Sequence, residues 1–202
     1  MSVAQFISGF LGASTIEIIA SISGFICVFL LIRRSIWNWL FGLVQVTLFV
    51  WIFYHNKLYS DALLNFTYIG FQCYGWWNWL HHQDAHAELI VEPTTIKNLL
   101  LWLTASLIGT MLLGFVMHNY TDASFAYTDA YITCTSLVAQ WLLTRRQLFN
   151  WLFWIVVDIV AIAIYLQKGL YPTSVLYFTF LIMSCVGQFS WWQRYRQQHI
   201  AS

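Results

Sequence analysis

Long apolar stretches alternate with short polar connections along almost the whole chain. A helix that crosses the hydrocarbon core of a bilayer needs about twenty mainly apolar residues, and stretches of this kind recur throughout the sequence. The connections hold paired arginines or short runs of Asn, Asp, Thr, Lys and Gly, which are typical of helix ends. We therefore predict seven transmembrane helices, at residues 16–32, 36–55, 59–80, 97–118, 124–144, 148–166 and 171–192.

Three segments lie outside these helices. Residues 1–15 are weakly apolar and are predicted to lie along the membrane interface. Residues 81–96 form the longest connection, with three His, three acidic residues and Pro93, and residues 193–202 form a polar tail. We expect both this loop and this tail on the cytoplasmic side.

The composition is that of a membrane protein and excludes a soluble domain. Of the 202 residues, 60% are hydrophobic and 8% are charged, whereas a soluble domain carries roughly 25% charged residues. The formal net charge of +1 leaves no basic surface for nucleic acid. The four cysteines lie singly in apolar stretches, where a thiol is expected to pack as a small hydrophobic group.

Basic residues predict the orientation of the chain, because cytoplasmic connections of membrane proteins are enriched in Lys and Arg. On one side the connections and ends hold Arg33, Arg34, Lys97, Arg145, Arg146, Arg194 and Arg196. The opposite side holds only Lys57 and Lys168. We therefore expect a protein of the bacterial inner membrane, surrounded by lipid, with a periplasmic N-terminus and a cytoplasmic C-terminus.

The sequence contains an internal repeat. A shift of 112 residues overlays the first three helices on the last three without a gap, and it matches Arg33-Arg34 with Arg145-Arg146, Asn38-Trp39 with Asn150-Trp151, and Gly75 with Gly187. We predict a first three-helix repeat at 16–80, a linker helix at 97–118 and a second repeat at 124–192. Four crossings precede the second repeat, so both repeats enter the membrane in the same direction, as parallel repeats do in some transporters. The predicted fold is an all-α membrane protein of three plus one plus three helices.

Polar side chains recur at helical spacing on five of the predicted helices. Such residues face the protein interior, because hydrocarbon offers them no hydrogen bonds. We expect them to line a polar, aromatic-walled cavity between the repeats. The expected cavity residues are Asn38, Gln45, Asn65, Gln72, Gln140, Asn150, Trp154, Asp158, Tyr177 and Gln188. For each residue the alternative is a hydrogen bond that joins two helices, and the sequence leaves that choice open.

The acidic residues differ in their expected roles. Asp158 falls in the middle of its helix without a basic neighbour, which makes it a candidate for ligand binding. Trp154 lies one turn away, and an aromatic face beside a carboxylate suits a flat cation. Glu17 and Asp129 lie near the outer ends of their helices, where an acid caps a helix or lies at the entrance. Because Gly42 aligns with Trp154, we expect open space in the first repeat and a stacking wall in the second.

Other functional classes fit the sequence poorly. A retinal protein needs a lysine inside the bundle, but all three lysines lie at helix ends. The sequence has no HExxH, GxSxG or paired-aspartate motif of an intramembrane enzyme, so we expect a protein without catalysis and without a cofactor. The remaining possible metal ligands are interpreted as part of a solvated loop; they are His81, His82, Asp84 and His86.

Several motifs resemble the Pnu family of vitamin transporters. They are Phe41-Gly42-Leu43, Tyr74-Gly75-Trp76, Ser136-Leu137-Val138-Ala139 and Asn150-Trp151-Leu152-Phe153-Trp154. The resemblance covers residues 16–192 and implies the same helix arrangement, a possible homotrimer and facilitated diffusion. It also implies that a cytoplasmic kinase phosphorylates the imported vitamin and so traps it. By the same resemblance the pocket includes Asn150, Trp154, Asn65 and Gln72.

The resemblance leaves three vitamins open. The nicotinamide riboside branch of the family has Leu-Leu-Gln, Glu-Asn-Trp and a polar residue before a glycine, where this chain has Leu63-Leu64-Asn65, Phe149-Asn150-Trp151 and Val186-Gly187. A pocket that keeps its packing residues but changes its hydrogen-bonding residues is expected to bind a different ligand. A ligand that leaves buried polar groups of the pocket unpaired binds weakly. Thiamine, a flat cation with a hydroxyl group, is expected first, nicotinamide riboside second and riboflavin third.

Overall fold

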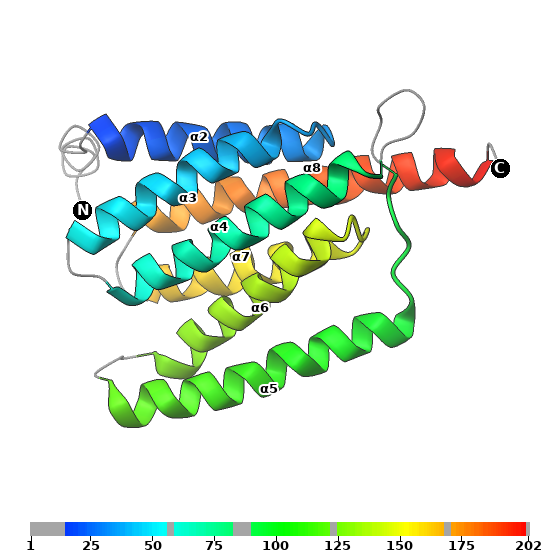
Figure 1. Ribbon diagram of the computed structural model, residues 1–202. Coiled ribbons are helices and arrows are strands. Elements are labelled where there is room, and N and C mark those ends of the chain that lie inside the picture. Colours follow the sequence, from blue (N-terminus) through cyan, green and yellow to red (C-terminus); the bar gives the residue numbers. More distant parts are fainter. Residues whose placement is uncertain (1–14, 56–58, 83–89, 122–124, 168–170, 201–202) are drawn as a thin grey trace. The chain divides into compact units, whose positions relative to one another are not determined.

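The described part of the chain is helical almost throughout. The computed structural model describes residues 15–55, 59–82, 90–121, 125–167 and 171–200. Within them, β-structure is limited to one isolated bridge. The helices are α2 (Thr15–Ile32), α3 (Asn38–His55), α4 (Tyr59–Leu80), α5 (Ile96–Tyr120), α6 (Ala126–Thr144), α7 (Asn150–Gln167) and α8 (Tyr171–Ile200) (Figure 1). The predicted all-α fold is therefore confirmed.

Five helices are long and apolar enough to cross a membrane, by length and composition. They are α2, α3, α5, α7 and the Ser174–Gln198 part of α8. The helices α4 and α6 are of similar length but richer in polar residues, among them Asn65, Gln72 and Gln140. Polar side chains make a helix less apolar on average without preventing it from crossing, provided that they face other helices. The predicted interfacial segment 1–15 lies outside the described residues except for Thr15.

The last helix is longer than the sequence prediction. We expected it to end at residue 192, but α8 continues to Ile200 and includes most of the predicted tail. Residues 193–200 contain no Gly or Pro that would stop a helix, and their Gln and Arg residues favour helical structure. The polar composition of this stretch indicated only that it lies outside the hydrocarbon core.

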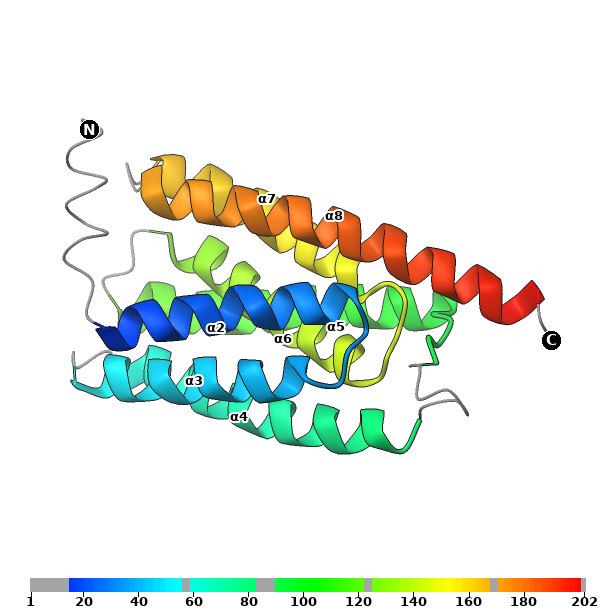
Figure 2. The ribbon, with the colours of Figure 1, turned by 90° about the horizontal axis from the view of Figure 1, so that it is seen from above.

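The chain divides into two compact units, residues 1–89 and 90–202. In the first unit α3 packs against both α2 and α4. In the second unit α5 packs on α6, α6 on α7, and α7 on α8, and the last two lie side by side in Figure 2. The predicted linker helix, α5, thus belongs to the second unit.

The same turn leads into α3 in the first unit and into α7 in the second. Arg34 and Arg146 lie in the left-handed backbone region, with φ angles of 58° and 59°. The N–H group of each donates to the carbonyl three residues earlier, at 2.9 Å. This conformation ends a helix and satisfies its last carbonyls. The next helices begin four residues later, at Asn38 and Asn150, so residues that match in the repeat also match in local structure.

In each unit a tryptophan of one helix packs against a glycine and a second tryptophan of the next helix. The rings of each pair meet edge to face, with centroids 5.1 Å apart in the first unit and 5.9 Å in the second. All four indoles are at most 1% exposed. Buried aromatic rings contribute large apolar areas and fix the register of the helices that carry them. The pairs are Trp39 with Trp79 across Gly75, and Trp151 with Trp191 across Gly187.

Small and hydroxylated residues join α5 to α6. The hydroxyl groups of Ser106 and Thr135 are hydrogen-bonded at 2.8 Å, and Tyr127 lies against Gly114. Small side chains let two membrane helices approach closely. The opposite face of α5 exposes large apolar side chains such as Leu112 and Phe115, as expected of a helix that faces lipid.

Candidate binding site

Three layers of paired side chains join α7 to α8. Consecutive layers are seven residues apart on both helices, which is about two helical turns, so they follow one line along the interface. One end layer is formed by Tyr165 and Tyr177, whose rings are stacked, with centroids 5.2 Å apart and an angle of 28° between their planes. The middle layer is therefore polar and lies between two aromatic ones. The layers are Trp151 with Trp191, Asp158 with Ser184, and Tyr165 with Tyr177.

Asp158 is the carboxylate of the middle layer. It is the ninth of the 18 residues of α7 and is 3% exposed. Ser184 Oγ donates a hydrogen bond to Asp158 Oδ2 at 3.1 Å, and Asp158 forms no ion pair with the described residues. Burying a carboxylate away from water costs several kcal/mol unless an opposite charge compensates it. One neutral hydroxyl does not supply that charge, whereas a cationic ligand would.

Trp154 lies one turn before Asp158 on α7. It is half-buried and packs on a cluster formed by Val138, Ala139 and Leu142 of α6 with Phe153. The indole is thus supported by α6, while Asp158 is bonded to α8. Because part of the indole surface stays exposed, the structure is compatible with the predicted stacking of Trp154 on a ligand and also with the alternative that it only packs helices together.

The side chains of the two predicted asparagines are hydrogen-bonded to the turns that precede their helices. The Asn38 side chain donates Nδ2–H to the carbonyl of Ser35 at 2.7 Å, and Asn150 donates in the same way to Gln147 at 2.8 Å. Both residues are at most 1% exposed. Asn150 Oδ1 is buried and accepts no hydrogen bond from the described residues. An unsatisfied buried carbonyl costs about 1–3 kcal/mol, so this oxygen is a candidate acceptor for a ligand or a water.

Two glutamines of the first unit lie against glycines of neighbouring helices. Gln45 of α3 lies on Gly24 of α2, and Gln72 of α4 lies on Gly42 of α3. The space that we expected beside Gly42 is therefore occupied by the Gln72 amide. A glycine seen alone in the sequence indicates room, but the structure shows which side chain fills it. Gln72 is 8% exposed, and its Oε1 accepts no hydrogen bond from the described residues.

Replacing Gly42 with Ala is expected to displace the Gln72 amide without unfolding the protein. An added Cβ would lie 2.5 Å from Gln72 Nε2, but a flexible side-chain end moves at little cost, so we expect stability within about 1 kcal/mol of the parent. If Gln72 contacts the ligand, Gly42→Ala should weaken binding as much as Gln72→Ala does. Ligand titration of both variants measures this. Parent-like binding by Gly42→Ala beside weak binding by Gln72→Ala would contradict it.

The remaining predicted residues are distributed over both units. Asn65 is half-buried in α4, and Gln140 is buried in α6. Tyr177 belongs to the tyrosine layer of the α7–α8 interface, and Gln188 is half-buried with an Oε1 that accepts no hydrogen bond from the described residues. The first unit thus contributes Asn38, Gln45, Asn65 and Gln72, and the second unit contributes the other six.

The two entrance or capping acids lie where helix capping places them. Glu17 is in the first turn of α2 and Asp129 in the first turn of α6. An acid at this position interacts favourably with the positive end of the helix dipole. Whether these acids cap their helices or lie at an entrance stays a prediction.

The histidines after α4 lie at a helix end. The rings of His81 and His82 are hydrogen-bonded through Nδ1 to the carbonyls of Trp77 and Asn78, both at 2.7 Å. Asp84 and His86 lie outside the described residues. In the part of the chain that the structure describes, no group of three His, Cys, Asp or Glu side chains is arranged to hold a metal.

Two residues of the α7–α8 interface were missed at the level of sequence. Neither Tyr165 nor Ser184 is among the cavity residues expected from the sequence. No local sequence pattern identifies them, because the register of α7 against α8 is set by packing. In the structure, the contact of Trp151, seven residues before Asp158, with Trp191, seven residues after Ser184, shows that register.

The described residues are almost all helical, and five of their helices are long and apolar enough to cross a membrane, which defines a multi-pass membrane protein. Residues 14–193 match the protein-family model described as nicotinamide mononucleotide transporter, so the chain belongs to that family. It is a family of transporters and not of enzymes, and the expected resemblance is confirmed.

Individual relatives cover most of the chain. The nicotinamide riboside transporter PnuC of Escherichia coli is 27% identical, over 88% of this chain and 85% of its own length. The riboflavin/roseoflavin transporter RibM of Streptomyces davaonensis is 26% identical, over 90% and 86%. The crystal structure of the vitamin B3 transporter PnuC superposes with a TM-score of 0.72 at 28% identity, over 89% of this chain and 81% of that one. Relatives with different vitamins are thus about equally similar to this chain.

Proposed function

We propose that this protein carries a cationic vitamin across the bacterial inner membrane by facilitated diffusion. The observation that carries the proposal is the buried Asp158, whose carboxylate has Ser184 as its hydrogen-bond donor and no ion pair among the described residues. A cationic heteroaromatic ring would neutralise this carboxylate and stack on Trp154. A later phosphorylation of the vitamin by a cytoplasmic kinase keeps the flow inward.

Nicotinamide riboside is the first candidate substrate. It is a cation, and it is the substrate named for relatives from Escherichia coli and Neisseria mucosa. Thiamine, which the sequence departures favoured, is the second candidate, because Asn65 and Phe149 stand where the riboside branch has other hydrogen-bonding groups. No relative described here is named for thiamine. Riboflavin is neutral and gains nothing from Asp158, so it comes third despite the similarity to RibM.

Titration of the purified protein with the three vitamins tests the substrate. We expect the two cations to bind at least about tenfold more tightly than riboflavin, which corresponds to about 1.4 kcal/mol. Uptake by proteoliposomes should follow the same order and should not change when a pH or sodium gradient is imposed. Tightest binding of riboflavin would refute the role of charge, and uptake that requires an ion gradient would refute facilitated diffusion.

The orientation and assembly remain part of the proposal. The excess of basic residues at Arg33-Arg34 and Arg145-Arg146 supports cytoplasmic positions for these turns, a periplasmic N-terminus and a cytoplasmic C-terminus. A homotrimer is implied by the family resemblance alone.

A further inference from the structure

A short extended segment lies along the turn between α6 and α7. This segment, called the strap here, consists of Ile90, Val91 and Glu92. Glu92 N–H donates to Arg146 O at 2.9 Å, and Leu148 N–H donates to Glu92 O at 3.0 Å. These bonds make Glu92 and Gln147 a parallel bridge, the isolated one of the described residues.

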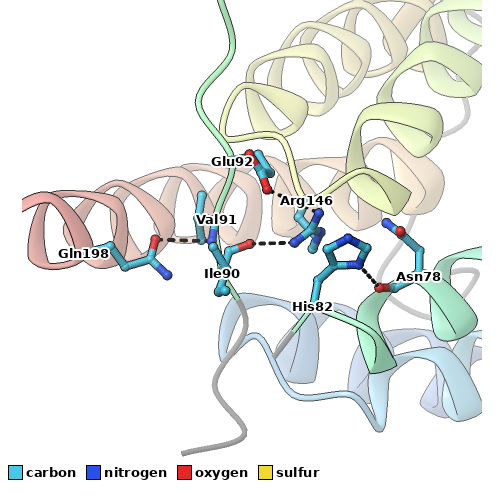
Figure 3. A network of polar contacts seen from close by, with 7 residues as sticks. All are labelled: Asn78, His82, Ile90, Val91, Glu92, Arg146 and Gln198. Carbon is cyan, nitrogen blue, oxygen red and sulfur yellow. Dashed lines mark hydrogen bonds and ion pairs between the residues drawn. The ribbon is translucent and has the colours of Figure 1, made fainter. Parts of the chain in front are cut away.

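The strap is also held by the end of α8. Val91 is 2% exposed, and its N–H donates to Gln198 Oε1 at 3.2 Å (Figure 3). Gln198 lies in the part of α8 that extends beyond the predicted membrane span. The extension of α8 therefore has a definite contact, and the strap connects it to the α6–α7 turn.

The side chain of Arg146 extends from this turn back to the strap and contacts it. Its guanidinium donates Nη1–H to Ile90 O at 3.5 Å and forms an ion pair from Nη2 to Glu92 Oε1 at 3.3 Å (Figure 3). Arg146 is 6% exposed. A buried arginine needs such partners, because an uncompensated charge away from water is strongly destabilising.

The same turn places the first residue of the candidate site. The carbonyl of Gln147, directly after Arg146, accepts from the Asn150 side chain at 2.8 Å and from the Asn150 N–H at 3.2 Å. Asn150 begins α7, the helix that carries Trp154 and Asp158. A shift of the turn would therefore move the start of α7 along α8.

The corresponding turn of the first unit has the same backbone conformation. Arg34 adopts the same conformation there, and Asn38 makes the same side-chain bond to Ser35. No β-bridge to that turn occurs in the described residues. Among the described residues, the strap is therefore a feature of the second unit, where Arg146 joins it to the turn.

We propose that Arg146 is a positioning residue for the vitamin site, held in place by Glu92 and Ile90 O. It fixes the α6–α7 turn to the end of α8, and it thereby sets where Asn150 and the carboxylate of Asp158 lie. The proposal rests on the proposed function of the site. Arg146 contacts no ligand in this scheme and acts through Gln147.

Uptake kinetics of four variants test the proposal. Arg146→Gln should raise the half-saturating vitamin concentration about tenfold, equivalent to about 1.4 kcal/mol, with the maximal rate changed less than about twofold. Arg146→Lys, which keeps the charge but not the fork of donors, should give an intermediate value. Glu92→Gln, which leaves the backbone bonds of the strap intact, should act in the same direction more weakly. The matched control Arg34→Gln should leave the half-saturating concentration unchanged.

A second measurement does not depend on transport. Hydrogen exchange at the amides of residues 146–152 should be faster in Glu92→Gln and Arg146→Gln than in the parent, and exchange at residues 34–40 should not change. A loss of maximal rate and stability with parent-like half-saturation would show a structural ion pair only and would overturn the proposal. So would unchanged exchange at 146–152. If the parent protein carries none of the vitamins, the proposed function fails, and the exchange data alone decide whether Arg146 fixes the turn.

Discussion

Replacing Asp158 with Asn is expected to weaken binding of a cationic vitamin by roughly tenfold to a hundredfold, the equivalent of about 1.5–3 kcal/mol for a charge-assisted contact. Asn has nearly the same size and can still accept the hydrogen bond of Ser184, which lies 3.1 Å from the carboxylate. The substitution therefore removes the charge and leaves the packing of α7 on α8 in place. Binding titrations with nicotinamide riboside and thiamine measure the effect.

Two controls separate charge from packing at Asp158. Ser184→Ala removes the hydroxyl and keeps the carboxylate, so it should weaken cation binding much less than Asp158→Asn does. Riboflavin, which is neutral, should bind the parent and the Asp158→Asn variant about equally. Cation binding that is the same in Asp158→Asn and in the parent would remove Asp158 from the site and with it the observation on which the proposed function depends.

Replacing Gly75 with Ala is expected to destabilise the protein by about 1–3 kcal/mol, as overpacking of a rigid core does. A Cβ at Gly75 would collide with the six-membered ring of Trp39. Trp39 is fully buried and is in contact with Trp79, so its ring has no free space into which to turn. The thermal unfolding temperature in detergent should fall, and the yield of folded protein should fall with it.

Gly70 offers a matched control for Gly75 in the same helix. No atom lies within 4 Å of a Cβ at Gly70, so Gly70→Ala should be neutral or stabilising by about 0.5–1 kcal/mol, because Ala favours helices over Gly. Combining Gly75→Ala with Trp39→Leu should be less harmful than the sum of the two single changes, because the smaller side chain relieves the collision. Equal stability of Gly75→Ala and Gly70→Ala would contradict this packing.

Local properties of the chain were readable from the sequence. Except for the end of α8, the length of each apolar stretch predicted the helices to within a few residues, because the energy of hydrocarbon burial and helix formation depends on residues close in the chain. The ungapped match of Arg33-Arg34 with Arg145-Arg146 indicated equal turns, and Arg34 and Arg146 do adopt the same φ. The missing stop signal after residue 192 could also have been used to extend the last helix.

The tertiary structure decided which side chains meet. Sequence patterns placed Gln72 and Gly42 on neighbouring helices, but only packing shows that the Gln72 amide fills the space beside Gly42. The sequence marked Asp158 as unusual and could not identify Ser184 as its partner. The strap at Glu92 was expected to be a solvated loop, yet it pairs with Arg146, 54 residues later. Such contacts depend on how whole helices pack against one another, and the local pattern of apolar and polar residues does not encode that register.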